Sequence, residues 1–179
     1  SWSSPAALLS SPSAALSSLT CTSLARVPCE ILRTTLGADG SGYEFIHMPG
    51  GGVTNPATVE SVEAKMHKIQ LKGRETFRFA VSTMSRLVKE YIADYDEDEL
   101  GLIVPHQVNR RIIDAALDRL EMTDEKVMVN IQSFGNTSAA SVPVALHQAV
   151  TEERCVPGKL VVLVAFGAGL TWGATLIRW

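Results

Sequence analysis

The sequence contains little cysteine, and its three cysteines are scattered along the chain. Cys21, Cys29 and Cys155 are odd in number and lack the close spacing of metal ligands, so they predict neither a disulfide framework nor a metal site. The four histidines show no metal-ligand spacing either. We therefore predict a protein without a metal or a resident cofactor, in a reduced, cytoplasmic setting.

Other absences narrow the class of protein further. No apolar run approaches the ~20 residues of a membrane-spanning helix, so no span is predicted. The 16 basic and 19 acidic side chains leave a formal charge of −3, too small to indicate nucleic-acid binding. A G-x-S-x-G motif is missing, which argues against a serine hydrolase. With 179 residues, the chain is long enough to bury the core of one domain.

The first thirty residues differ in composition from the rest. Residues 1–30 are dominated by Ser, Ala, Leu and Pro without a convincing period. They lack the basic region that precedes the apolar run of a secretory signal. We therefore predict a poorly packed, low-complexity segment over 1–30 and a folded domain over 31–179.

Helical and extended patterns alternate within that domain. Apolar residues recur at helical spacing over 77–91, 108–120 and 139–150. Short apolar runs predict strands from Ile31, over 102–104 and 127–131, and within 159–169 and 170–179. After the first strand the order is α-β-α-β-α-β-β. This order predicts a layered α/β fold with a mixed, mostly parallel sheet that ends in an antiparallel pair.

Polar side chains follow two of the expected strands. His106 comes directly after 102–104, and Asn136 comes after 127–131. Ligands bind beyond the carboxyl ends of strands in open α/β sheets, and the small-residue bend Phe166–Gly169 is expected at the same edge. A helix start beside His106 favours the neutral imidazole, which can donate an N–H, as can the Asn136 amide. Two such donors on one oxygen form an oxyanion or enolate site.

Less specific interpretations apply to the same residues. A lone histidine at a strand end is often only a structural hydrogen-bonding residue, and an asparagine after glycine is often a turn or N-cap residue. Arg110 and Arg111 lie where cations oppose the helix dipole, which suggests an acidic or phosphate-bearing partner. The alternative is that both are surface residues whose stems cover apolar area. The same choice applies to nearby basic residues, namely Lys65, Lys68, Lys72 and Arg74.

Three separated motifs carry a resemblance to a known family. In order along the chain they are VPHQVNRRII, GNTSAASVPVAL and AFGAGLTWGATLIRW. From about Ile31 to Trp179 the sequence closely resembles the C-terminal half of 3-oxoacyl-acyl-carrier-protein synthase III. This resemblance implies one half of a thiolase-like fold.

The resemblance also implies roles for individual positions. His106 and Asn136 match the residues that stabilise the thioester enolate. The pocket loop corresponds to Phe166, Gly167, Ala168 and Gly169. The segment that contacts acyl carrier protein corresponds to Gln107, Val108, Asn109, Arg110 and Arg111, with Arg111 as its basic anchor.

The activity implied is an acyltransferase reaction of fatty acid biosynthesis. It is the decarboxylative Claisen condensation of an acyl-CoA with malonyl-acyl carrier protein, carried out by a homodimer. The family's nucleophilic cysteine lies in the N-terminal half, which this chain is expected to lack, and none of the three cysteines has the surroundings of a nucleophile. The alternative is a non-catalytic module that binds acyl carrier protein or pairs with a separate N-terminal half.

Overall fold

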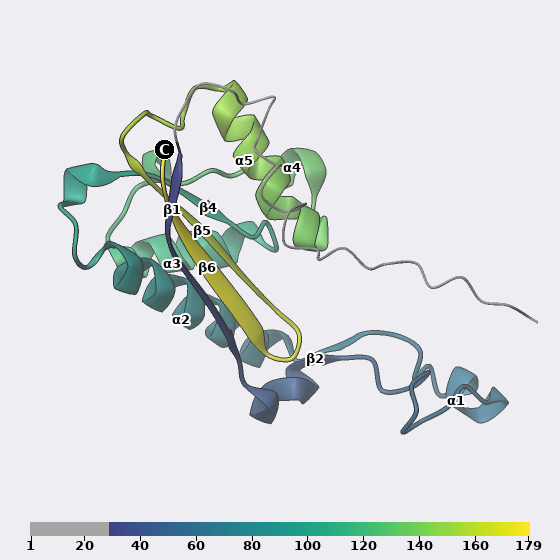
Figure 1. Cartoon of the computed structure of the whole chain (residues 1–179). Helices are drawn as coiled ribbons and strands as arrows, with labels where there is room; N and C mark the ends of the chain where they lie inside the picture. The colour runs from purple at the N-terminus through teal and green to yellow at the C-terminus, as the bar shows by residue number, and fades with distance from the viewer. Residues whose placement is uncertain (1–28) are drawn as a thin grey trace, which may run out of the picture.

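The computed structural model describes residues 29–179 (Figure 1). The prediction for residues 1–30 therefore lies almost wholly outside the described residues. The strands are β1 (Glu30–Ala38), β2 (Ile46–His47), β3 (Gln70–Leu71), β4 (Leu100–Pro105), β5 (Leu160–Gly167) and β6 (Thr171–Arg178). The helices are α1 (Val59–Glu63), α2 (Gly73–Ile92), α3 (Arg110–Leu120), α4 (Ile131–Phe134) and α5 (Ser141–Thr151).

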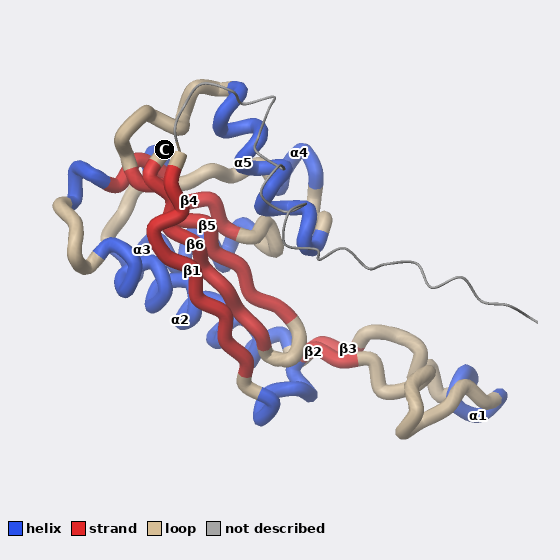
Figure 2. Tube along the Cα trace, viewed as in Figure 1, coloured by secondary structure: helices blue, strands red, loops and turns tan. Residues whose placement is uncertain are grey.

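One mixed sheet forms the centre of the structure (Figure 2). Its strand order is β1-β6-β5-β4. Strand β4 runs parallel to β5, whereas β6 is antiparallel to both β5 and β1. The layered α/β fold and the closing antiparallel pair are thus confirmed. The expectation of a mostly parallel sheet is wrong, because β1 joins the sheet beside β6 and adds a second antiparallel pairing.

The strand expected over 127–131 is also wrong. Val127 makes only an isolated parallel bridge to Ile103, and the Met128 N–H donates to the Ile103 carbonyl at 2.8 Å. Two residues later the Asn130 N–H donates instead to the Gln107 side chain at 3.0 Å. The chain therefore leaves the sheet and enters α4. The apolar run 127–131 thus contributes one β-bridge and the start of a short helix instead of a strand.

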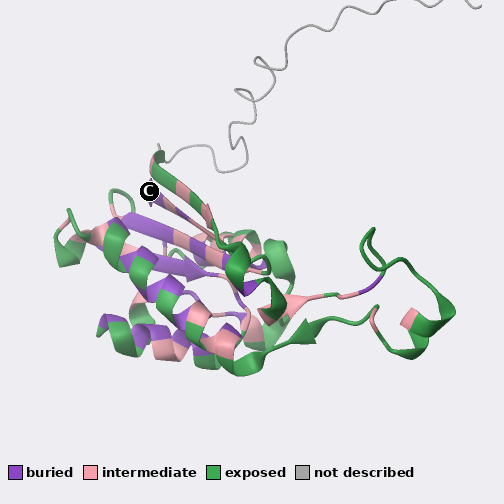
Figure 3. Cartoon of the chain, turned by 90° about the horizontal axis from the view of Figure 1, so that it is seen from below, coloured by how far each residue is buried: buried purple, intermediate pink, exposed green. Residues whose placement is uncertain are grey.

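Helices cover both faces of the sheet, but unequally. Helices α2 and α3 pack on one face, where the Tyr91 hydroxyl donates to the Ala174 carbonyl at 2.8 Å. Helix α5 packs on the other face over β4 and β5. Side chains alternate along β5, with Val162 in the first core cluster and Val161 in the second. Strand β1 is largely exposed (Figure 3), and Leu36 retains 82% of its accessible surface.

A small arm between β1 and α2 stands away from the sheet (Figures 1 and 2). Strands β2 and β3 pair at its base, where Ile46 lies opposite Leu71. Thr58 and Ser61 cap its helix α1 reciprocally. Several of its apolar side chains are exposed, with Val53 fully so.

Candidate functional site

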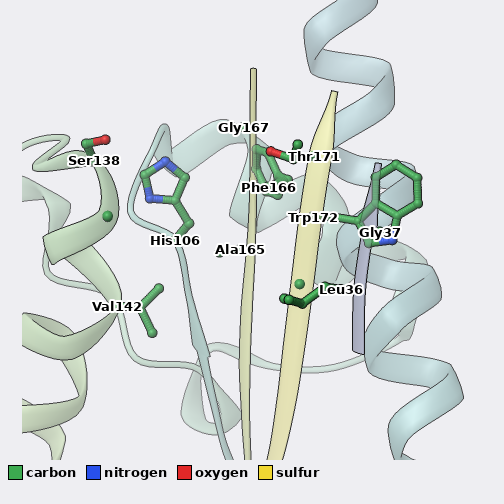
Figure 4. Close-up of a pocket in the computed structure, with 12 residues that line it drawn as sticks. Leu36, Gly37, His106, Ser138, Val142, Ala165, Phe166, Gly167, Thr171 and Trp172 are labelled. Carbon is green, nitrogen blue, oxygen red and sulfur yellow. The ribbon is translucent and has the colours of Figure 1, made fainter. Parts of the chain in front are cut away.

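An open, mainly apolar hollow of about 540 Å³ lies at one end of the sheet. Its size is typical of a small-molecule site. Figure 4 shows His106 on one side of it and the β5–β6 end on the other. The residues around it come from β1 (Leu36, Gly37), β5 (Ala165, Phe166, Gly167), β6 (Thr171, Trp172, Gly173), the region where α5 begins (Ser138, Ala139, Val142) and the end of β4 (His106). The sequence did not indicate Leu36 or Trp172, because apolar and aromatic residues in strands usually serve the core.

His106 occupies the position expected from the sequence, directly after β4. Its backbone N–H donates to the Val164 carbonyl at 2.8 Å, which ties it to β5. Its Nδ1 lies 2.6 Å from the Ser141 hydroxyl oxygen. The ring meets the Phe166 ring edge-on, with centroids 5.8 Å apart. The imidazole is therefore held from two sides while lining the hollow.

Burial lowers the pKa of His106 below its ordinary value of about 6.5. The neutral imidazole is thus favoured near pH 7, as the sequence predicted. The expected cause was the start of the following helix, but α3 begins only at Arg110. Loss of contact with water accounts for the direction instead.

A pH titration tests this electrostatic assignment. We expect the NMR titration midpoint of His106 to lie below 6.5, because burial penalises the charged ring. As pH falls below the unfolded-state value, the unfolded chain binds the proton first, so the free energy of unfolding decreases until the native pKa is passed. Between pH 7 and pH 5 the wild type should lose more stability in urea titrations than His106→Gln. An equal loss in both proteins would contradict the assignment.

Asn136 lies in the exposed loop after α4. Its Oδ1 accepts a hydrogen bond from the Ser138 N–H at 2.9 Å, which is the turn role considered from the sequence. This bond leaves the amide N–H groups available to a ligand, and the described residues supply no acceptor for them. Ser138 lines the hollow, whereas Asn136 does not. The convergence of Asn136 and His106 on one oxygen therefore stays a prediction.

The bend after β5 contributes only part of the expected loop. Phe166 and Gly167 line the hollow. Ala168 and Gly169 form the turn itself, and the Ala168 carbonyl accepts from the Thr171 hydroxyl at 2.9 Å. Gly169 has a φ of +136°, and a Cβ there would approach Thr171 at 2.7 Å. The turn therefore requires glycine at this position.

Gly37 and Trp172 form the far wall of the hollow. They are directly opposite each other in the β1–β6 register. A Cβ on Gly37 would overlap the Trp172 indole. The Trp172 ring can occupy this position only because residue 37 is a glycine.

Gln107 is enclosed in the structure, although the resemblance places it in the segment that contacts acyl carrier protein. It is 1% exposed, and its Nε2 donates to the carbonyls of Pro105 at 2.9 Å and Met128 at 3.0 Å. Its Oε1 accepts the Asn130 N–H. This enclosed side chain links separate segments of the fold, and its contact with a carrier protein stays a prediction.

Val108 and Asn109 also make contacts that stabilise the fold. Val108 is partly buried against the main core. Asn109 is the N-cap of α3, where its Oδ1 accepts the Arg111 N–H at 3.0 Å. This local bond explains why helix α3 begins at Arg110.

The two adjacent arginines differ in their surroundings. Arg110 forms ion pairs with Asp114 and Asp124, and the bond to Asp124 is the main cause that raises its pKa. Arg111 makes no ion pair among residues 29–179. It instead lines a hollow of about 280 Å³ together with Arg74 and Arg78 of α2.

The basic hollow of Arg74, Arg78 and Arg111 was only partly anticipated. Arg74 was among the basic residues noted in the sequence, but Arg78 was not. Its signal was the spacing of four residues from Arg74, which places both on one side of a helix. Lys72 does not line this hollow, and its Nζ pairs with Glu44 at 2.8 Å.

The described cysteines lie outside the main hollow. Cys155 is buried, and burial raises the pKa of its thiol, which disfavours the nucleophilic thiolate. Cys29 is exposed. Neither residue lines the hollow, and Cys21 falls outside the described residues. The described part of the chain also holds no cluster of metal-ligating side chains, and none of its helices has the length and apolar character to cross a membrane.

Comparison with known proteins places this site in a family. Residues 92–179 match the family model described as 3-oxoacyl-[acyl-carrier-protein (ACP)] synthase III C terminal. The beta-ketoacyl-[acyl-carrier-protein] synthase III of Natranaerobius thermophilus is 47% identical over 146 residues, which make up 80% of this chain and 44% of that protein. The corresponding protein of Symbiobacterium thermophilum is 46% identical over 83% of this chain and 46% of its own length.

Solved structures agree with these sequence relationships. The Aquifex aeolicus 3-oxoacyl-[acyl-carrier-protein] synthase III shares 40% identity and superposes with a TM-score of 0.71, covering 84% of this chain and 45% of that one. The Thermus thermophilus synthase III gives 39% identity and a TM-score of 0.72, covering 86% and 47%. The chain thus spans slightly less than half the length of these relatives. It belongs to the 3-oxoacyl-[acyl-carrier-protein] synthase III family and corresponds to roughly the C-terminal half of such a protein.

Proposed function

We propose that this chain supplies the enolate-stabilising and carrier-docking half of a 3-oxoacyl-acyl-carrier-protein synthase III. The complete reaction is the decarboxylative Claisen condensation of an acyl-CoA with malonyl-acyl carrier protein. The observation that carries the proposal is the half-buried His106 at the edge of an apolar hollow, within a chain of this family. No cofactor is needed for this chemistry, and a cytoplasmic homodimer is part of the same proposal.

The chemistry assigned to this half is the loss of CO₂. When the malonyl thioester decarboxylates, the electron pair of the breaking C–C bond moves toward the thioester carbonyl and forms an enolate. The neutral His106 imidazole, held by Ser141 and Phe166, donates an N–H to that oxygen, and the Asn136 amide is the proposed second donor. Donors fixed in advance in an apolar site stabilise such charge most effectively. The enolate carbon then attacks the acyl carbonyl that a cysteine of the N-terminal half holds as a thioester. The new C–C bond forms, the C–S bond breaks, and the cysteine thiolate is the leaving group.

The proposal is tested by separating the two half-reactions. The chain is incubated with malonyl-acyl carrier protein, and acetyl-acyl carrier protein and CO₂ are measured. A second incubation uses labelled acetyl-CoA, followed by mass spectrometry of the protein. We expect decarboxylation without acylation of Cys155 or Cys29. Failure to decarboxylate, alone or with an added N-terminal half, would contradict the proposed function.

Docking of the carrier protein is assigned to the basic hollow of Arg74, Arg78 and Arg111. Carrier proteins present acidic surfaces and a phosphopantetheine group, which arginine guanidinium groups recognise. Of the two adjacent arginines, Arg111 is the stronger candidate, because no carboxylate among the described residues forms an ion pair with it. Arg110 is a weaker candidate, since two aspartates already share its charge.

A pair of arginine variants tests this docking assignment. Arg111→Ala should weaken binding to malonyl-acyl carrier protein ~3–10-fold, with a smaller dependence on salt, because one cation of the docking surface is lost. Arg110→Ala should change binding less, since its charge is offset within the chain. Affinities from calorimetry at two salt concentrations provide the measurement. Unchanged binding by Arg111→Ala would contradict the assignment.

The second candidate is a non-catalytic module that binds carrier protein or pairs with a separate N-terminal half. The exposed strand β1 favours this candidate, because its apolar residues Ile31 and Leu36 have no covering layer among the described residues. Such a module would bind the carrier protein with the same dependence on Arg111 but leave its malonyl group intact. The decarboxylation assay therefore distinguishes the two candidates.

A further inference from the structure

Ser141, the first residue of α5, links His106 to the neighbouring backbone. It is 2% exposed. Its Oγ lies 2.6 Å from His106 Nδ1 and accepts the backbone N–H of Gln107 at 3.2 Å. Ser141 lies in the GNTSAAS segment, but its sequence position alone gave no sign of this contact, because the two residues are 35 positions apart.

The hydrogen bonds around Ser141 determine which imidazole nitrogen carries the proton. A hydroxyl has one proton and two lone pairs. The Gln107 N–H can only donate, so it occupies one lone pair. If His106 Nδ1 also donated, the Ser141 proton would have no acceptor, since the described residues offer Oγ no third partner. A buried hydroxyl without an acceptor is unfavourable.

The remaining arrangement satisfies every group. The Ser141 hydroxyl donates to His106 Nδ1, which is then bare, and Nε2 carries the proton of the neutral ring. Because the two nitrogens lie on different sides of the ring, Nε2 faces away from Ser141, and the ring lines the hollow (Figure 4). The Nε2–H thus lies on the part of the ring that has no hydrogen-bond partner among the described residues.

We propose that Ser141 is a positioning residue that fixes His106 as the Nε2–H tautomer and orients it as a hydrogen-bond donor. This inference rests on the proposed function for its catalytic meaning. An enolate oxygen requires a donor, and a bare Nε2 would present a lone pair to the developing negative charge. Without the Ser141 hydroxyl, a fraction of the molecules would hold the unproductive tautomer, and the ring would be free to rotate.

Nitrogen NMR of the His106 ring tests the tautomer independently of any activity. Protonated and bare imidazole nitrogens resonate in separate ranges, so a two-bond proton–nitrogen spectrum at neutral pH identifies each. We expect the wild type to show a protonated Nε2, a bare Nδ1 and contacts between the His106 and Phe166 rings. Ser141→Ala should show averaged nitrogen signals and weaker ring contacts. Ser141→Thr retains the hydroxyl and should restore the wild-type spectrum.

A matched control removes a different buried hydroxyl. Ser85 is 4% exposed in α2, where its Oγ donates to the Val81 carbonyl at 2.6 Å. Ser85→Ala should leave the His106 signals unchanged. A protonated Nδ1 in the wild type, or a Ser141→Ala spectrum identical to that of the wild type, would overturn the proposal.

The kinetic arm separates this inference from the proposed function. Ser141→Ala should lower kcat for malonyl-acyl carrier protein decarboxylation about tenfold, the equivalent of one net hydrogen bond, with KM unchanged. If the NMR results are as expected but the wild type does not decarboxylate, the positioning by Ser141 stands and the proposed function fails. An unchanged kcat in Ser141→Ala, in an active protein, would overturn the catalytic part of the inference.

Discussion

Replacing His106 by alanine is expected to lower the rate of malonyl-acyl carrier protein decarboxylation by about 10²–10³-fold, the usual loss for one oxyanion donor. The half-buried ring supplies a neutral N–H in an apolar hollow, where water substitutes poorly for it. KM should change little, because the carrier protein is proposed to dock elsewhere, at the basic hollow. Steady-state release of CO₂ measures both constants.

His147→Ala serves as the matched control for this variant. His147 is an exposed histidine of α5 that lines a different hollow, so its removal should leave the rate unchanged. Circular dichroism of both variants verifies that the fold is retained. A His106→Ala protein with the wild-type rate would contradict the assignment of His106 as an enolate-stabilising donor.

The second large effect concerns stability and involves Gln107. We expect Gln107→Ala to lower the free energy of unfolding by about 2–4 kcal/mol, because buried groups left without partners cost about 1–3 kcal/mol each. The variant leaves the Met128 carbonyl and the Asn130 N–H without the partner that Gln107 provides, and it removes one hydrogen bond to the Pro105 carbonyl. Urea unfolding monitored by circular dichroism measures the change.

An exposed glutamine provides the comparison for Gln107. Gln132 lies in α4 and makes only a long 3.4 Å hydrogen bond to the Val129 carbonyl, so Gln132→Ala should stay within about 0.5 kcal/mol of the wild type. If both variants had equally small effects, Gln107 would not be the structural link described above. If Gln107→Ala folded stably but bound the carrier protein more weakly, the result would instead support a docking role for Gln107.

The sequence predicted the elements whose apolar residues repeat regularly. It did not predict the features that depend on contacts between distant segments. Helix α2 was correctly expected because apolar residues repeat at helical spacing over 77–91, within the 20 residues of the helix. The run at 127–131 has equally apolar residues, but the Gln107 side chain captures the Asn130 N–H that a strand would have used. Likewise, no local pattern shows that β1 joins the sheet beside β6, about 140 positions later in the chain.

The candidate site was predictable to a similar degree. His106 was found because a histidine after a buried strand is a local signal, and its lowered pKa was expected in direction though not in cause. Ser141 and Trp172 were missed because their contacts arise only when distant segments meet. Arg110 and Arg111 are indistinguishable in sequence, and only the positions of Asp114 and Asp124 separate a neutralised cation from an available one.

The glycine opposite Trp172 gives protein engineers a simple means of resizing the cavity. Since no side chain at residue 37 can coexist with the indole where it now lies, introducing alanine there must displace the ring and change the volume of the hollow. The size of this hollow is thus coupled to a single backbone position on the edge strand β1.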